Sequence, residues 1–261
     1  MNAVAQWAAY ASLIIFLVAI GVRFMRIRHY PVNMRWEIYP IPHEGAQRAA
    51  YGGSKMEESD HWLKTHKPSR LTEMKFMLLE MVFIKGLFDH NRKLWWRSFP
   101  FHFGLYMLAG FIGLLGLGAV MQLAGIPVGS DAQGIGRLLA GLTTLVGVVG
   151  MVMSLLGAAG LLYLRISDDE LKQYTNGSHY FNLVVIMLVE ALGLVMWKTA
   201  DPDFSHCRQF IAGLLTFDLS SYTGSALVSF TIFSASLLIA YIPLTHMSHF
   251  FVKWFTWHKL R

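Results

Sequence analysis

The sequence predicts an all-α integral membrane protein with five membrane-spanning helices. Of its 261 residues, 54% are hydrophobic and only 15% are charged, which is rare in a soluble domain and typical of a membrane protein. The apolar residues gather in five long runs, each near the roughly 20 residues that a helix needs to cross the bilayer core. These runs are residues 7–24, 99–123, 136–164, 180–197 and 224–251.

Basic residues predict the orientation of the five spans. Residues 23–97 contain fourteen Lys and Arg, and the turn after the third span contains Arg165 and Lys172. The opposite side has only Arg137, Lys198 and Arg208. Because cytoplasmic loops carry an excess of Lys and Arg, we expect the N-terminus outside and the C-terminus in the cytoplasm of an inner membrane. The first span has its basic residues after it, unlike a cleaved signal peptide, so we expect it to remain as an anchor.

The chain is expected to have three parts. Residues 71–97 are apolar but are interrupted by charges such as Glu73 and Glu80, so they suit an amphipathic helix at the membrane interface better than a span. Such a helix would end at the Trp95–Trp96 pair, because Trp is enriched at membrane interfaces. The parts are a first transmembrane helix (1–28), a cytoplasmic segment containing this interfacial helix (29–97) and a four-helix transmembrane bundle (98–261).

Histidines are the main candidate ligands for a cofactor. The one cysteine, Cys207, excludes a Cys-ligated iron–sulfur cluster and a CxxCH haem attachment, whereas there are eleven histidines. Polar residues at membrane depth are costly, so those at span ends are functional candidates. In the predicted topology four histidines lie at the cytoplasmic ends of spans: His102, His179, His246 and His249.

Imidazoles that face one another across a helical bundle can hold a haem by axial ligation of its iron. Gly104 and Gly110 on the second span would leave room for the flat ring, although Gly also serves helix packing in membranes. The alternative is that the four histidines bind only the backbone or the membrane interface. Their spacing alone does not decide between these readings.

Three motifs resemble a known family. "FPFHFG" at 99–104 and "PLTHMSHFF" at 243–251 resemble the gamma subunit of respiratory nitrate reductase, a five-helix membrane cytochrome b. "RHYPVNMRWEIYPIPHEG" at 28–45 resembles the cytochromes b of the Tmc, Hmc and Dsr complexes of sulfate reducers, which sit beside heterodisulfide-reductase-like iron–sulfur proteins. The resemblance implies that helices two to five form a haem-binding bundle.

The resemblance also implies the haem ligands. The family pairs a histidine at the start of span two, here His102, with one placed six residues after a proline in span five. Counting from Pro243 gives His249. His246 would contact a haem propionate or replace His249 as the ligand.

The positions that ligate a second haem in the family are Ile112 and Thr231 here, and neither side chain can bind iron in this role. We therefore expect one haem b. The alternative is two haems, with His179 and His246 as the second ligand pair.

The expected function is electron transfer between a membrane quinone of the menaquinone type and a cytoplasmic iron–sulfur subunit of a redox complex. Glu190 is the one carboxylate well inside a span, so it is a candidate quinone or proton site or else a hydrogen-bonded bundle contact. Other protonatable candidates are Lys85, His43, Glu37 and His179. The outer loop 198–221 could rest on the bilayer or meet a periplasmic subunit such as a multihaem cytochrome c.

Two other classes of function remain open. The chain could be a haem-free membrane anchor, or a transporter, although no repeats or paired broken helices are apparent. No motif for substrate chemistry is present, so we expect that chemistry in partner subunits. We expect no nucleic-acid partner.

Overall fold

The computed structural model describes residues 2–29, 44–51, 53, 57–65, 69–218 and 222–249, and within these ranges every regular element is helical. The chain divides into two compact units. The first unit comprises residues 1–17 and 91–242, and the second comprises residues 18–90 and 243–261. Each unit is described by itself.

Five helices are long and apolar enough to cross a membrane, which confirms the predicted fold class. Large apolar side chains on these helices face outward, and Leu138, Leu156 and Leu188 are each more than 60% exposed. Such surfaces are expected to contact lipid, where helices satisfy all of their backbone groups internally. The five helices are α1 (Asn2–His29), α5 (Arg92–Leu123), α6 (Ile135–Ser167), α8 (Gly177–Thr199) and α10 (Ala226–Tyr241), the last continued by a 3-10 turn, η3 (Ile242–Leu244).

Glycines bring α5 and α6 into close contact. A Cβ atom added to Gly104 would lie 2.4 Å from the Ser154 backbone nitrogen, and one added to Gly157 would lie 2.3 Å from the Phe101 nitrogen. Small residues let membrane helices approach closely. Gly104 therefore serves helix packing and leaves no room for a flat ring, whereas a Cβ on Gly110 would meet no atom within 4 Å.

The stretch predicted as one interfacial helix over 71–97 is divided among three helices. α3 (Arg70–Phe83) is followed by Ile84, which caps its C-terminal end. The φ of Ile84 is 51°, a value that cannot continue a right-handed helix and is unfavourable for a β-branched residue. α4 (Lys85–His90) follows, and the Glu80 carboxylate accepts a hydrogen bond of 2.7 Å from the Gly86 amide at the junction. Asn91 caps α5, so Trp95 and Trp96 belong to the second membrane helix.

Shorter elements complete the described residues. α2 (Ala46–Ala49), η2 (His61–Leu63) and η4 (His246–Ser248) lie in the second unit, while α7 (Asp169–Gln173) and α9 (Ser205–Thr216) lie in the first. In the second unit the guanidinium of Arg48 forms ion pairs with Glu44 and Glu58.

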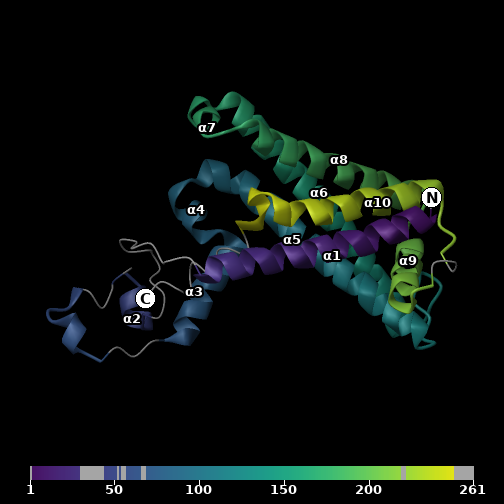
Figure 1. Cartoon of the computed structure of the whole chain (residues 1–261), viewed down its shortest axis with the longest axis horizontal. Coiled ribbons are helices and arrows are strands. Elements are labelled where there is room, and N and C mark those ends of the chain that lie inside the picture. Colours follow the sequence, from purple (N-terminus) through teal and green to yellow (C-terminus); the bar gives the residue numbers. More distant parts are fainter. Residues whose placement is uncertain are drawn as a thin grey trace. The chain divides into compact units, whose positions relative to one another are not determined.

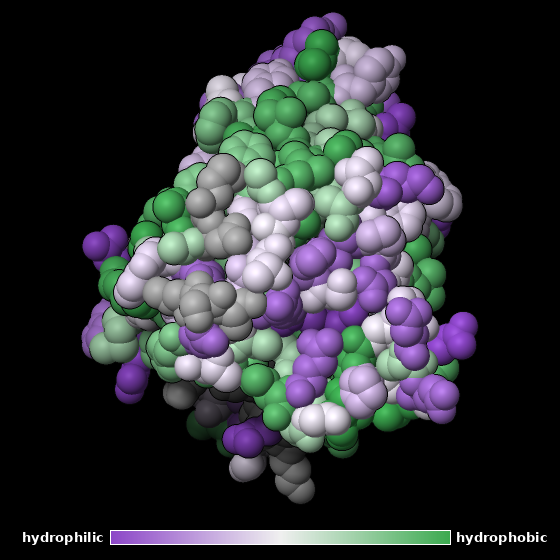
Figure 2. All heavy atoms as spheres, turned by 90° about the vertical axis from the view of Figure 1, so that its right-hand side faces the viewer, coloured by the Kyte–Doolittle hydropathy of each residue, from purple (hydrophilic) through white to green (hydrophobic). Residues whose placement is uncertain are grey.

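The hydrophobic core of the first unit lies where α9 packs against α5 and α10, at the end where α1 begins (Figure 1). The Tyr10 hydroxyl of α1 donates a 2.7 Å hydrogen bond to the Leu214 carbonyl of α9. Figure 2 looks onto this end, where hydrophilic residues gather near the middle of the face and hydrophobic residues lie above them. This end of the bundle thus combines a polar surface with an apolar interior.

Candidate functional site

His102 has the local geometry of a metal ligand. It is half-buried on α5, and its Nδ1 lies 2.7 Å from the Ser98 carbonyl oxygen. Because a carbonyl can only accept, Nδ1 donates its proton, and the lone pair of the neutral ring is on Nε2. A histidine that binds a metal usually has its other ring nitrogen fixed by such a bond. The edge of the ring also meets Phe101, with centroids 5.1 Å apart.

His246 and His249 lie on a turn beyond the end of the fifth membrane helix. α10 ends at Tyr241, two residues before the buried Pro243, because proline cannot continue the backbone hydrogen-bond pattern of a helix. The fifth span is therefore shorter than the predicted run of 224–251. In η4 the Ser248 hydroxyl donates to the Thr245 carbonyl at 2.9 Å.

The turn is tied to α1 and orients His249. The Arg23 guanidinium donates to the Ser248 hydroxyl, so the histidine-bearing turn is connected to the basic end of α1 within the second unit. The His249 Nδ1 donates to the His246 carbonyl at 3.1 Å, and the same reasoning places its lone pair on Nε2. Both histidine side chains are exposed. Since His102 belongs to the first unit, its pairing with His249 or His246 stays a prediction.

The His179 side chain helps to cap the start of α8. The Asn176 amide donates to His179 Nδ1 at 3.1 Å, while the Asn176 side chain accepts from the His179 amide at 3.4 Å, which forms a capping box. Nδ1 accepts here, so the proton of the neutral ring is on Nε2, opposite to His102. This cap was not predicted, although Asn before a helix is a known start signal that could have indicated it.

Glu190 is an isolated acid inside the bundle. Its side chain, on α8, is only 4% exposed, and both carboxyl oxygens are buried with no hydrogen-bond partner among the described residues. The Ser154 hydroxyl of α6 is fully buried and also lacks a partner of good geometry there, yet it lies near enough to act on the carboxyl. An unpaired polar group in such surroundings is costly, which favours a functional role.

The remaining candidate protonatable residues are less informative. Lys85 is half-exposed on α4 and forms an ion pair with Asp89 one turn later. His43 and Glu37 lie outside the described residues.

An open groove of about 920 Å³ follows α6 in the first unit. Its lining includes Ser130, Arg137, Leu145 and Val148, with Trp197 of α8 on one flank. None of the candidate histidines lines it, and Glu190 does not either. The groove is therefore separate from the candidate ligands.

Comparison with known proteins decides the family. The family model for the nitrate reductase gamma subunit matches residues 86–259, two thirds of the chain, including His102, Glu190 and His249. The chain belongs to the nitrate reductase gamma subunit family. No curated protein and no solved structure matches the chain significantly.

Membership in the nitrate reductase gamma subunit family establishes the general role. The family provides membrane cytochrome b subunits of redox complexes, which bind haem b and interact with quinone. The chain is accordingly a multi-pass protein of the inner membrane that serves in electron transport. The motif at 28–45 lies outside the matched residues, so the closer relation to the Tmc, Hmc and Dsr subunits stays a prediction.

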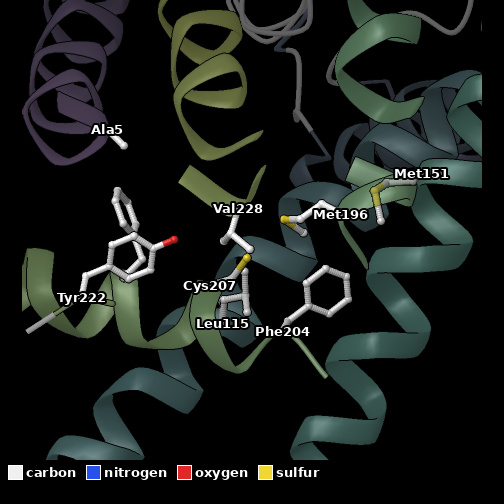
Figure 3. Close-up of a cluster of buried hydrophobic side chains, with 9 residues drawn as sticks. Ala5, Leu115, Met151, Met196, Phe204, Cys207, Tyr222 and Val228 are labelled. Atoms are coloured by element: carbon white, nitrogen blue, oxygen red, sulfur yellow. The ribbon is translucent and has the colours of Figure 1, made fainter. Parts of the chain in front are cut away.

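Ile112 and Thr231, at the positions expected to ligate the family's second haem, lie next to a packed cluster. Ile112 is 50% exposed on α5, while Thr231 is 7% exposed and donates to the Leu227 carbonyl at 2.8 Å. One turn beyond them, Leu115 and Val228 enter a buried cluster. Its members that converge in Figure 3 include Met151, Met196, Phe204, Cys207 and Tyr222. This interior is packed with side chains of the chain itself.

A buried polar network at α9 was not predicted from the sequence. Arg208 is fully buried and donates to the Asp203 carbonyl at 2.7 Å and the Val128 carbonyl at 3.4 Å. The Asp201 carboxylate accepts from the His206 and Cys207 amides at 3.1 and 3.0 Å and so caps the helix. The Asp residues before α9 were the available signal.

The pKa values of two groups at this network are shifted, those of Cys207 on α9 and of Asp203 just before it. Burial raises the pKa of the Cys207 thiol, so the thiol stays protonated and the reactive thiolate does not form. Burial opposes ionisation of Asp203 as well, but hydrogen bonds from Ser205 and Ser130 outweigh it and lower the pKa of that carboxyl. Hydrogen bonds thus tie the Asp203 carboxylate to the backbone of both Ser130 and Ser205.

Proposed function

We propose that the chain holds one haem b between His102 and His249 and transfers electrons between a membrane quinone and a cytoplasmic iron–sulfur subunit. The observation that carries the proposal is the pair of Nδ1 hydrogen bonds. The bond from His102 to the Ser98 carbonyl and the bond from His249 to the His246 carbonyl both leave Nε2 as the coordinating nitrogen. Both histidines lie in the stretch that matches a haem-binding family.

The turn after Pro243 favours His249 over His246 as the second ligand. The His246 carbonyl accepts a hydrogen bond from the His249 Nδ1, so the backbone of His246 already orients the other imidazole. The His246 side chain, one 3-10 turn earlier, would then contact a haem propionate. When bound, the haem carries one electron at a time, and the protein controls its potential and access.

A single haem is supported by two observations. The core formed by Leu115, Phe204 and Val228 fills the interior beside the positions of the family's other ligands. His179 is the candidate for an alternative second pair, but its Nδ1 lone pair accepts a hydrogen bond from the Asn176 amide in the cap of α8. We therefore propose no second pair of His179 and His246.

The electron donor or acceptor in the membrane is proposed to be a quinone of the menaquinone type. Its oxidation and reduction move protons as well as electrons, so the site needs a group that can hold a proton. Glu190 is the proposed group because its carboxyl is buried without a partner in the described interior. Lys85 and His43 are secondary candidates on the segment between α1 and α5.

The protein partners follow from the proposed topology, with the N-terminus outside and the C-terminus in the cytoplasm. Residues 29–97 would then form the cytoplasmic surface for an iron–sulfur subunit of the heterodisulfide-reductase-like kind. The α9 end of the first unit would face the periplasm, where a multihaem cytochrome c could dock. The buried Arg208 network supports this because it gives α9 a fixed position for a partner.

Visible spectra of histidine variants test the proposal. His102→Ala and His249→Ala should each abolish the reduced cytochrome b bands, because each removes one axial ligand. His246→Ala should keep the bands and serves as the matched control on the same turn. Bands that survive both ligand substitutions would show that other residues hold the haem. A colourless wild-type protein made with ample haem would show that the chain is a haem-free anchor instead.

A further inference from the structure

The surroundings of Glu190 contain no nearby countercharge in the described bundle. On α6 the charged residues are Arg137 and Arg165, near its two ends, and on α8 the basic residues are His179 and Lys198 at the ends. α10 contains no charged residue, and its one titratable side chain is Tyr241 at its last position. The group on a packed helix that acts on the carboxyl is the Ser154 hydroxyl. A carboxylate here would be desolvated and unneutralised.

Ser154 connects this acid to the helix that carries His102. A Cβ added to Gly104 would lie 2.4 Å from the Ser154 nitrogen and 2.7 Å from its Cβ, so the two helices touch at this point. Gly104 is two residues after His102 on α5. The carboxyl of Glu190 is thus separated from the ligand helix by one small residue, within the first unit.

A buried polar pair lies between Glu190 and the start of α8. Asn182 is 4% exposed and lies eight residues before Glu190 on the buried face of α8, about 12 Å along the helix. Its side-chain oxygen accepts a 2.7 Å hydrogen bond from the Tyr241 hydroxyl of α10. The pair lies toward the end of α8 that faces the cytoplasm in the proposed topology.

We propose that Glu190 takes up a proton when the haem held by His102 is reduced, which makes it a redox-linked protonation site. The inference rests on the proposed function. While the bound haem is oxidised, its positive charge would favour the ionised carboxyl of Glu190. When a quinol supplies one electron to the haem, this carboxylate would gain one proton from the solvent, so the net charge of the interior would be unchanged. A nearby negative charge disfavours the ionised carboxyl, and by reciprocity the ionised carboxyl disfavours reduction.

Redox titrations of the haem at several pH values test this in the purified protein. The wild-type midpoint potential should fall as pH rises, by at most about 59 mV per tenfold fall in proton concentration, the limit for one proton and one electron. Glu190→Gln should remove this dependence, and Glu190→Asp should retain it. Glu170→Gln, the same change at an exposed site on α7, is the matched control and should behave like the wild type.

A second measurement avoids dependence on the variant. The reduced-minus-oxidised infrared spectrum of the wild type should gain a C=O band of a protonated carboxyl on reduction. A wild-type potential independent of pH, a Glu190→Gln potential with unchanged pH dependence, or the absence of that band would each overturn the inference while leaving the haem in place. A wild-type protein without haem would instead overturn the proposed function.

Discussion

The imidazoles of His102 and His179 make opposite hydrogen bonds. His102 Nδ1 donates to a carbonyl at 2.7 Å, whereas His179 Nδ1 accepts from an amide at 3.1 Å. A bond to the backbone therefore fixes which nitrogen can bind a metal. The sequence identified both residues as candidates because both lie at span ends, but it could not distinguish their tautomers, which depend on local backbone geometry.

His179→Ala is expected to weaken the protein without removing the haem. The substitution deletes one half of the α8 capping box, and loss of a cap typically costs about 1 kcal/mol. Thermal unfolding in detergent would measure the loss, and the visible spectrum would report the haem. His90→Ala, the same change at an exposed histidine at the end of α4, is a suitable control. Loss of the cytochrome b bands in His179→Ala would mean that His179 is a ligand after all.

At the scale of the elements, the five membrane helices could be predicted because their length and apolar content are set by the bilayer. The boundaries that differ depend on single residues. α3 ends at Ile84 with a positive φ, and α10 ends two residues before Pro243. α9 is short and not strongly apolar, so the sequence suggested only an outer loop there. Gly104 was expected to leave room for a haem, but it packs against Ser154 of α6 instead. The sequence alone does not show which helix a glycine faces.

The contact between α5 and α6 beside the proposed ligand can be tested at Gly157. Gly157→Ala would place a Cβ atom 2.3 Å from the Phe101 nitrogen, next to His102, so the helices must separate. Overpacking of this kind costs about 1–3 kcal/mol. Thermal unfolding should show a lower midpoint, and the haem spectrum should shift.

Gly141→Ala is the matched control on the same helix, because a Cβ at that position meets no atom within 4 Å. It should leave the spectrum unchanged and should not lower the unfolding midpoint, because Ala is the better helix former. Equal stability of the two variants would contradict the close α5–α6 contact.

At the scale of the whole molecule, the candidate ligands are divided between two units, with His102 in the first and His249 in the second. The sequence placed them at a common depth through the topology and through the family resemblance. The family itself is now established by a match over residues 86–259, while the ligand pair and the number of haems remain proposals. The packed core at the α9 end of the first unit is the structural feature that favours one haem.

The ratio of haem b to polypeptide in the purified chain, produced with ample haem, would show whether the chain holds the single haem proposed. We expect one haem per chain, because His102 and His249 are the proposed ligand pair and the α9 end of the bundle is packed with side chains. A ratio of two would show that a second site exists despite this packing, and a ratio of zero would show that His102 and His249 hold no haem at all.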